Sequence, residues 1–187
     1  MKLALTLCLT GTLILTGCTN LGTQPNAGDL TDHWALTGKM AVRNATEASS
    51  FNVNWEQRSQ AFDIELSGPF GQGAVQITSV PGKVILTRGS EQVSRNTLSE
   101  LAYEITDLDL PLGYLQYWVR AKPYPGIDAT IERDPTSRQV NRITQSGWQV
   151  DYPVYFDTAS EALPRRIDFV RNNSSGRLVI RNWISEL

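Results

Sequence analysis

The chain has 187 residues, of which 41% are hydrophobic and 19% are charged, and its formal net charge is −2. This length fits one ordinary domain whose core needs no metal or disulfide for stability. A slightly acidic chain lacks the cationic surface that nucleic-acid-binding proteins use, so we expect no nucleic-acid partner.

The N-terminal segment predicts a lipoprotein signal. After a short positive start, residues 3–15 form an apolar run that is too short for a permanent transmembrane helix. The run closes on a Leu-Thr-Gly-Cys tetrad ending at Cys18, which resembles a bacterial lipobox. We therefore expect residues 1–17 to be a removed signal peptide and Cys18 to carry the lipid. The alternative is an ordinary secretory signal in which Cys18 is incidental.

The next stretch predicts a tether. Residues 18–32 are rich in Thr, Asn, Gly and Pro and lack apolar periodicity, so we expect a flexible link to a single domain of residues 33–187. With Cys8 removed and Cys18 lipidated, no free thiol remains to form a disulfide. In enteric lipoproteins an Asp after the lipidated cysteine often signals inner-membrane retention. Thr19 occupies that position, which by this resemblance implies anchoring at the periplasmic face of the outer membrane.

Strict alternation of apolar and polar residues predicts about 9 to 11 antiparallel strands, each half-buried on one face. In the first half of the chain these are Trp34–Val42, Phe51–Trp55, Phe62–Leu66, Gln72–Ser79, Lys83–Arg88 and a short strand around Val93. In the second half they are Gln139–Gln145, Trp148–Phe156, Arg165–Arg171 and Arg177–Ile184, with turns expected at residues 146–147 and 173–176.

Two helices are predicted in the middle of the chain. Thr97 and Glu100 have the spacing of a capping box, and apolar residues at helical spacing follow up to Ile105. Pro111 can open a second helix at its first turn. The apolar stripe of this second helix consists of Leu112, Leu115, Trp118 and Val119.

Many strands and a central helical pair favour a mainly β fold with two to three helices. We expect a strongly curved antiparallel sheet or incomplete barrel, because the helices must bury their apolar stripes and its concave face is the natural place. A gap left between helices and sheet would suit an apolar ligand.

Catalytic and metal-binding patterns are scarce. His33 is the only histidine, and no Gly-x-Ser-x-Gly, P-loop or dinucleotide-binding spacing is present. The carboxylate pairs Asp63 with Glu65, and Asp107 with Asp109, fall on a solvent face and at a helix end, which does not favour a glycosidase. We expect neither an enzyme nor a bound metal or cofactor.

The order of motifs along the chain resembles the LolB family of outer-membrane lipoprotein receptors. After the lipobox come the segment Trp34–Val42, a Gly-Pro-aromatic-Gly loop, Pro111 with Leu115 and Trp118, and finally Trp183. The resemblance implies an unclosed antiparallel β-barrel whose helices plug an apolar cavity. It also implies a monomer that accepts lipoproteins from the periplasmic carrier LolA, binds their acyl chains, and inserts them into outer-membrane lipid.

The same resemblance implies a membrane-insertion loop formed by Gly68, Pro69, Phe70 and Gly71. The family carries an exposed leucine there, which Phe70 replaces, although this side chain could also fold back onto the core edge. Ala121 stands where the family pattern leads us to expect a glycine after the second helix.

Large apolar residues at inward-facing positions are candidates for the acyl-chain cavity, although the same spacings also suit a solid core. They are Trp55, Ile105, Tyr114, Leu115, Trp118, Trp148, Tyr152 and Trp183. Two other functions stay open from the sequence: a structural lipoprotein that docks onto an envelope assembly machine without holding lipid, and, more remotely, a secreted hydrolase.

Overall fold

The computed structural model describes residues 33–68, 71, 73–105, 111–157 and 162–185, and for residues 103–105 and 185 only the backbone. The predictions for the signal peptide, for Cys18, for the tether and for Pro69 and Phe70 lie outside these residues. No helix among the described ranges is both long and apolar enough to cross a membrane.

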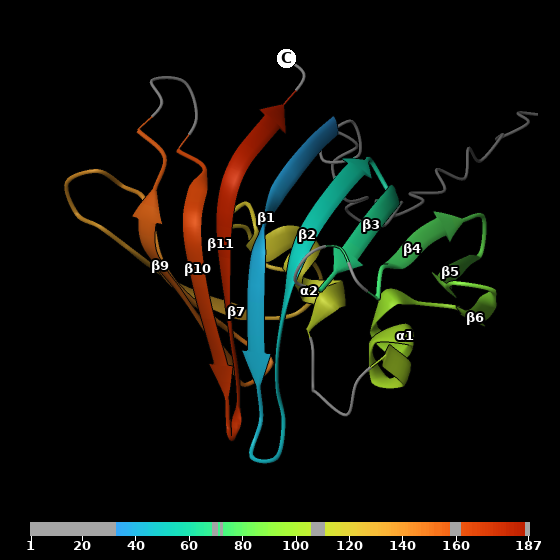
Figure 1. The fold of residues 1–187 in the computed structure, drawn as a ribbon. Helices are drawn as coiled ribbons and strands as arrows, with labels where there is room; N and C mark the ends of the chain where they lie inside the picture. Colours follow the sequence, from blue (N-terminus) through green and yellow to red (C-terminus); the bar gives the residue numbers. More distant parts are fainter. Residues whose placement is uncertain (1–32, 69–70, 72, 106–110, 158–161, 186–187) are drawn as a thin grey trace, which may run out of the picture.

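Eleven antiparallel strands form one sheet in the order β6-β5-β4-β3-β2-β1-β11-β10-β9-β8-β7. The strands are β1 (His33–Arg43), β2 (Ala48–Arg58), β3 (Ala61–Ser67), β4 (Val75–Val80), β5 (Lys83–Arg88), β6 (Glu91–Arg95), β7 (Ala129–Arg133), β8 (Val140–Gln145), β9 (Trp148–Tyr155), β10 (Pro164–Arg171) and β11 (Ser174–Ser185). β6 and β7 stand at the two ends of this order, so the sheet is unclosed, as predicted. Figure 1 shows the sheet bending around α2, with α1 beside β5 and β6.

The first and last strands pair at the centre of the sheet, where the register shifts. Thr37 of β1 faces Asn182 of β11, but Gly38 faces Ile180, which marks a β-bulge. A Cβ at Gly38 would lie 2.5 Å from the carbonyl oxygen of Val179. Only glycine fits this close approach of two backbones, and the bulge adds the local twist that a curved sheet needs.

Several strand bounds differ from the prediction by up to three residues, as in β2 and β4, and two larger differences have a physical reason. β7 was not expected, because four of its five residues are exposed and an edge strand with no buried face gives no period-2 signal. The expected turn at residues 173–176 was placed too late, since β11 already begins at Ser174. Gly176 is part of the strand, where a Cβ would meet the ring of Phe169 at 2.2 Å. This glycine therefore makes room for an aromatic ring on β10.

The two predicted helices are α1 (Leu98–Ile105) and α2 (Leu112–Trp118). The residues of the predicted capping box cap α1. The backbone N–H of Glu100 donates to Thr97 Oγ1 at 3.1 Å, and Glu100 Oε2 reaches back to accept from the N–H of Asn96, one residue before Thr97, at 3.1 Å. The predicted apolar stripe of α2 is fully buried, since Leu112, Leu115, Trp118 and Val119 are at most 2% exposed.

The core lies on the concave face of the sheet, between the strands and the helices. Its aromatic residues pack edge to face, with ring centroids 6.3 Å apart for Trp118 and Trp148 and 5.8 Å apart for Trp148 and Phe169. A second cluster joins Trp34 to Trp55 and to Trp183, each pair at 5.5 Å. The inner face of the sheet is therefore packed with side chains in this conformation.

Candidate functional site

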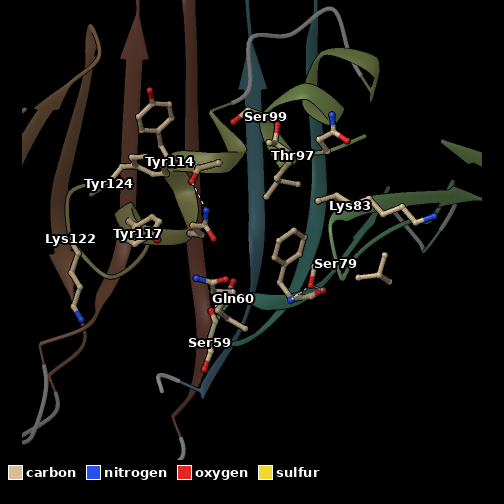
Figure 2. A pocket seen from close by; sticks show the side chains of 18 of the residues that line it. Ser59, Gln60, Ser79, Lys83, Thr97, Ser99, Tyr114, Tyr117, Lys122 and Tyr124 are labelled. Carbon is tan, nitrogen blue, oxygen red and sulfur yellow. Dashed lines mark hydrogen bonds between the residues drawn. The ribbon is translucent and has the colours of Figure 1, made fainter. Parts of the chain in front are cut away.

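A cavity of about 490 Å³ opens where the helices meet one end of the sheet. Its walls come from the N-terminal turn of α1, from α2 and the segment that follows it, and from the turns that join β2 to β3 and β4 to β5. Figure 2 shows side chains from these separate parts of the sequence converging on the cavity. Its volume lies within the range of natural ligand-binding clefts.

The cavity lining combines apolar and polar groups. Apolar and aromatic members are Trp34, Phe62, Val80, Val84, Leu98, Tyr114, Tyr117, Tyr124 and Ile127. Uncharged polar side chains come from Gln57, Ser59, Gln60, Ser79, Asn96, Thr97, Ser99 and Gln116. The charged members among the described residues are Lys83, Arg120 and Lys122, so no acidic side chain lines the cavity there.

Gln145 fixes α2 and the following segment to the sheet. Its amide is 1% exposed and makes four hydrogen bonds. Oε1 accepts from Trp118 Nε1 at 3.0 Å and from the backbone N–H of Tyr124 at 2.9 Å. Nε2 donates to the carbonyl of Tyr124 at 2.8 Å and to that of Ile127 at 2.9 Å. Because every hydrogen-bonding site of this amide is used, β8 holds the wall of the cavity in one arrangement.

A tyrosine supports the same attachment. Tyr152 of β9 is 3% exposed, and its hydroxyl donates to the carbonyl of Trp118 at 3.0 Å. Burial raises the pKa of Tyr152 well above its usual range, with smaller contributions from Tyr155 and Asp151. Burial likewise raises the pKa of Tyr155 to about 12. Tyr152 therefore stays protonated and donating at physiological pH.

The contact between α1 and α2 is of a different kind. Gly113 of α2 lies against Ser99 of α1, and a Cβ at Gly113 would be 2.3 Å from Ser99 Oγ. Both residues also line the cavity. On its other side α1 packs on β5 and β6, and its buried side chains include Leu98 and Leu101. The two helices thus touch through two small residues.

Of the predicted cavity residues, Tyr114 lines the observed cavity. It stacks on Trp118 with ring centroids 5.1 Å apart, and its hydroxyl donates to Ser146 Oγ at 3.0 Å. Five others lie in the packed core, at most 3% exposed, and do not line this cavity: Trp55, Leu115, Trp118, Trp148 and Tyr152.

Trp183 is half-buried at the sheet's centre, where its Nε1 donates to the carbonyl of Pro164 at 2.9 Å. The side chain of Ile105 lies outside the description. Of the predicted insertion loop, the structure describes Gly68 and Gly71. Gly71 is exposed, has a φ of 76° and donates its N–H to the carbonyl of Gly68 at 3.1 Å.

Ala121 sits at the position where a glycine was expected. Its φ is 53°, the left-handed conformation that commonly ends a helix and that glycine adopts most easily. The N–H of Ala121 donates to the carbonyl of Trp118 at 2.9 Å, and the N–H of Lys122 donates to that of Tyr117 at 3.2 Å. The chain therefore ends α2 in the usual way with a less suitable residue.

Sequence reasoning missed Gln145, the Ser99–Gly113 contact and the basic members of the cavity lining. A signal for Gln145 was available, because it is two residues after Ile143 on the same strand and that spacing places it on the core face. A polar residue on a core face needs partners, which marks it as structurally important. Nothing in the local sequence indicated the other two.

The described fold defines a class of protein in which an unclosed antiparallel sheet wraps two helices. A LolA superfamily protein from Nitrosomonas europaea superposes with a TM-score of 0.55 at 8% identity, over 84% of this chain and 87% of that chain. A DUF1329 family protein from Desulfovibrio piger superposes with a TM-score of 0.50 at 9% identity, over 84% and 86% of the two chains.

Sequence comparison identifies the family. The chain belongs to the outer membrane lipoprotein LolB family, whose sequence profile matches residues 32–183. It is 35% identical to the outer-membrane lipoprotein LolB of Halorhodospira halophila over 152 residues, which cover 80% of this chain and 74% of the relative. The LolB of a Marinomonas species is 28% identical over 185 residues, which cover 95% of this chain and 96% of the relative.

Membership fixes the broad role. The protein is an outer-membrane lipoprotein that functions in lipoprotein localization, as the sequence predicted. The LolB family consists of lipoprotein-transport receptors and not enzymes, which agrees with the expectation of no catalytic activity.

Proposed function

We propose that this protein accepts lipoproteins from the periplasmic carrier LolA and inserts them into the outer membrane, and that it shields their acyl chains between the helices and the sheet during transfer. The observation that carries this proposal is the cavity of about 490 Å³ beside an apolar core that the two helices cover. Membership of the LolB family supports the direction of transfer.

The cost of exposing acyl chains explains why such a receptor is needed. Burying one methylene is worth about 0.8 kcal/mol, so a chain of ~15 methylenes costs on the order of 10 kcal/mol to leave in water. Transfer from a carrier therefore needs a continuous apolar path. A difference of a few kcal/mol in favour of this receptor is enough to make the transfer nearly complete.

The path that we propose starts at the cavity and passes between α1 and α2. The core is packed in this conformation, so an acyl chain needs one helix to move. Gln145 and Tyr152 hold α2 on the sheet, whereas α1 meets α2 through Ser99 and Gly113. We therefore assign the movement to α1.

Such a movement would bring the predicted cavity residues into use. Leu115 and Trp118 lie on the buried face of α2, and Trp55, Trp148 and Tyr152 lie on the sheet beneath it. These residues would contact the acyl chains only after α1 has moved. Tyr114 lines the cavity already and would meet the chains first.

Two further parts of the proposal concern the membrane. Lipid on Cys18 would anchor the protein at the periplasmic face of the outer membrane, since two or three acyl chains bind a bilayer stably. Phe70, between Gly68 and Gly71, would enter the headgroup region and give the cargo a route into the bilayer.

The test mixes purified LolA loaded with one lipoprotein with this protein and outer-membrane vesicles, and then follows where the cargo is found. We expect the cargo to move from LolA to this protein and then to the vesicles. With Phe70→Glu we expect receipt to continue and insertion to stop. The matched control Val154→Glu, an exposed apolar residue on β9 that is several strands away from β3 in the sheet, should change neither step. Cargo that stays on LolA would contradict the proposed receipt of lipoproteins. Normal insertion by Phe70→Glu would contradict the proposed role of Phe70 in insertion.

A further inference from the structure

The cavity lining carries charged side chains, which an entrance that admits only hydrocarbon would not need. Lys83, Arg120 and Lys122 are the charged residues among the described members of its lining, and all three are basic. The chain as a whole is slightly acidic, with a net charge of −2. Basic side chains are thus concentrated at a site in a protein that has an excess of acidic ones.

The basic groups lie around the cavity and not at one point. In Figure 2, Lys83 at the start of β5 and Lys122 after α2 lie on opposite sides of the cavity. Uncharged donors stand between them, among them Ser59, Gln60 and Thr97. In Figure 2 the ammonium ends of Lys83 and Lys122 point outward from the middle of the cavity, so a group placed there meets uncharged donors inside and positive potential at the rim.

This chemistry suits the head of an amphiphile better than its tail. Hydrocarbon gains nothing from ammonium groups or amides, whereas ester, amide and carboxylate oxygens accept from them. Buried apolar residues such as Trp34 and Leu98 belong to the same lining, so a ligand can place its head in the cavity while its chain points toward the core.

We propose that this cavity binds the polar head of the cargo, meaning the acylated residue and the peptide directly after it, and selects heads that carry negative charge over heads that carry positive charge. This inference rests on the proposed function, because it assumes that acylated chains enter here. It adds a preference among cargo proteins that is set by the charge of the residues next to their lipid.

The test uses the full chain reconstituted in nanodiscs of zwitterionic phosphatidylcholine, with empty nanodiscs as the blank. Two dodecanoyl peptides that differ only in charge, Ser-Asp-Asp-Ser and Ser-Lys-Lys-Ser, are titrated while tryptophan fluorescence is followed. We expect the acidic peptide to bind about tenfold more tightly at low salt, because its two carboxylates are attracted by the basic lining that repels the two ammonium groups of the other peptide. The ratio should fall toward one at about 1 M salt, where screening acts within ~3 Å.

Charge-reversal variants locate the effect. Lys83→Glu and Lys122→Glu should each reduce the preference severalfold, whereas Lys39→Glu, an exposed change on the outer face of β1, should leave it unchanged. Equal affinities for the two peptides would overturn this inference, and so would a loss of preference as large in Lys39→Glu as in the cavity variants. Equal binding would leave the proposed function standing, whereas no binding of either peptide would contradict both.

Discussion

The two helices cover the same concave face of the sheet but are held there in different ways. α2 and the segment after it are attached by hydrogen bonds from buried side chains. The amide of Gln145 makes one to Trp118 of α2 and three to Tyr124 and Ile127, and the hydroxyl of Tyr152 makes one more to Trp118. α1 is placed by apolar packing on β5 and β6 and by the contact of Ser99 with Gly113. Directional bonds between buried groups resist displacement, whereas packing between small residues allows sliding or separation.

This difference indicates which of the two helices can move. A receptor that admits an acyl chain must open without losing its fold. Opening at α1 leaves the bonds of Gln145 intact, whereas opening at α2 would leave buried polar groups of Trp118 and Tyr124 without partners. The energetics therefore favour α1 as the moving element.

The largest effect is expected from Gln145→Leu. Removal of this amide leaves the N–H groups of Trp118 and Tyr124 and two carbonyls unpaired, so we expect the free energy of unfolding to fall by about 3–5 kcal/mol. Chemical denaturation measures this. In the matched control Gln149→Leu, which removes a partly exposed amide bonded to Asp151, the loss should stay below about 1 kcal/mol. Equal losses would show that Gln145 is no special anchor.

The next effect concerns the contact between the helices. Gly113→Leu should hold α1 away from α2, because even a Cβ at this position comes within 2.3 Å of Ser99 Oγ. We expect a fluorescent fatty acid to associate several times faster, and stability to fall by about 1–3 kcal/mol from overpacking. Stopped-flow fluorescence gives the rate.

A double variant serves as the control for that prediction. Ser99→Gly with Gly113→Ser exchanges the two side chains across the same contact and should keep the association rate near that of the unaltered protein. If Gly113→Leu bound the probe no faster than this exchange variant, acyl chains would not enter between α1 and α2.

A smaller effect should appear at alkaline pH. Burial raises the pKa of Tyr155 to about 12 and that of Tyr152 well above its usual range, so the folded state keeps protons that the unfolded state releases near pH 10. Stability from these groups is complete below pH 10 and is lost as pH rises toward 12. In Tyr152→Phe with Tyr155→Phe, the slope of stability against pH in this window should be shallower. An unchanged slope would mean that groups other than Tyr152 and Tyr155 cause the loss of stability at alkaline pH.

The smallest effect is expected at the end of α2. Ala121 adopts a φ of 53°, so Ala121→Gly should relieve strain and raise the free energy of unfolding by about 0.5–1 kcal/mol. Thermal unfolding measures the gain. The control Ala129→Gly, at the start of β7, should instead be neutral or destabilising. A loss of stability in Ala121→Gly would contradict this explanation of the residue.

Most of the fold could be predicted because apolar alternation is local information. Strands that bury one face, such as β1 and the first half of β9, could be predicted because apolar residues alternate with polar ones there, and the structure buries these apolar residues. β7 was not, since an exposed edge strand is specified by its partner β8 and not by its own pattern.

The candidate site could be predicted only in part. Spacing shows that Trp55, Trp118 and Trp148 face inward, but a packed core and an acyl-chain cavity require the same residues at the same spacing. The basic members of the cavity lining come from segments that are far apart in the sequence, such as Lys83 and Lys122. Their placement around one cavity is a product of the tertiary fold, so no local pattern reveals it.

The central claim is that acyl chains enter between α1 and α2, and a reversible crosslink tests it most directly. A Cβ at Gly113 would lie 3.7 Å from the Cβ of Ser99, a spacing that suits a disulfide. In Ser99→Cys with Gly113→Cys, oxidation should block transfer of a lipoprotein from LolA and reduction should restore it, while either single variant transfers normally. Transfer that is as fast in the oxidised double variant as in the reduced one would contradict the account.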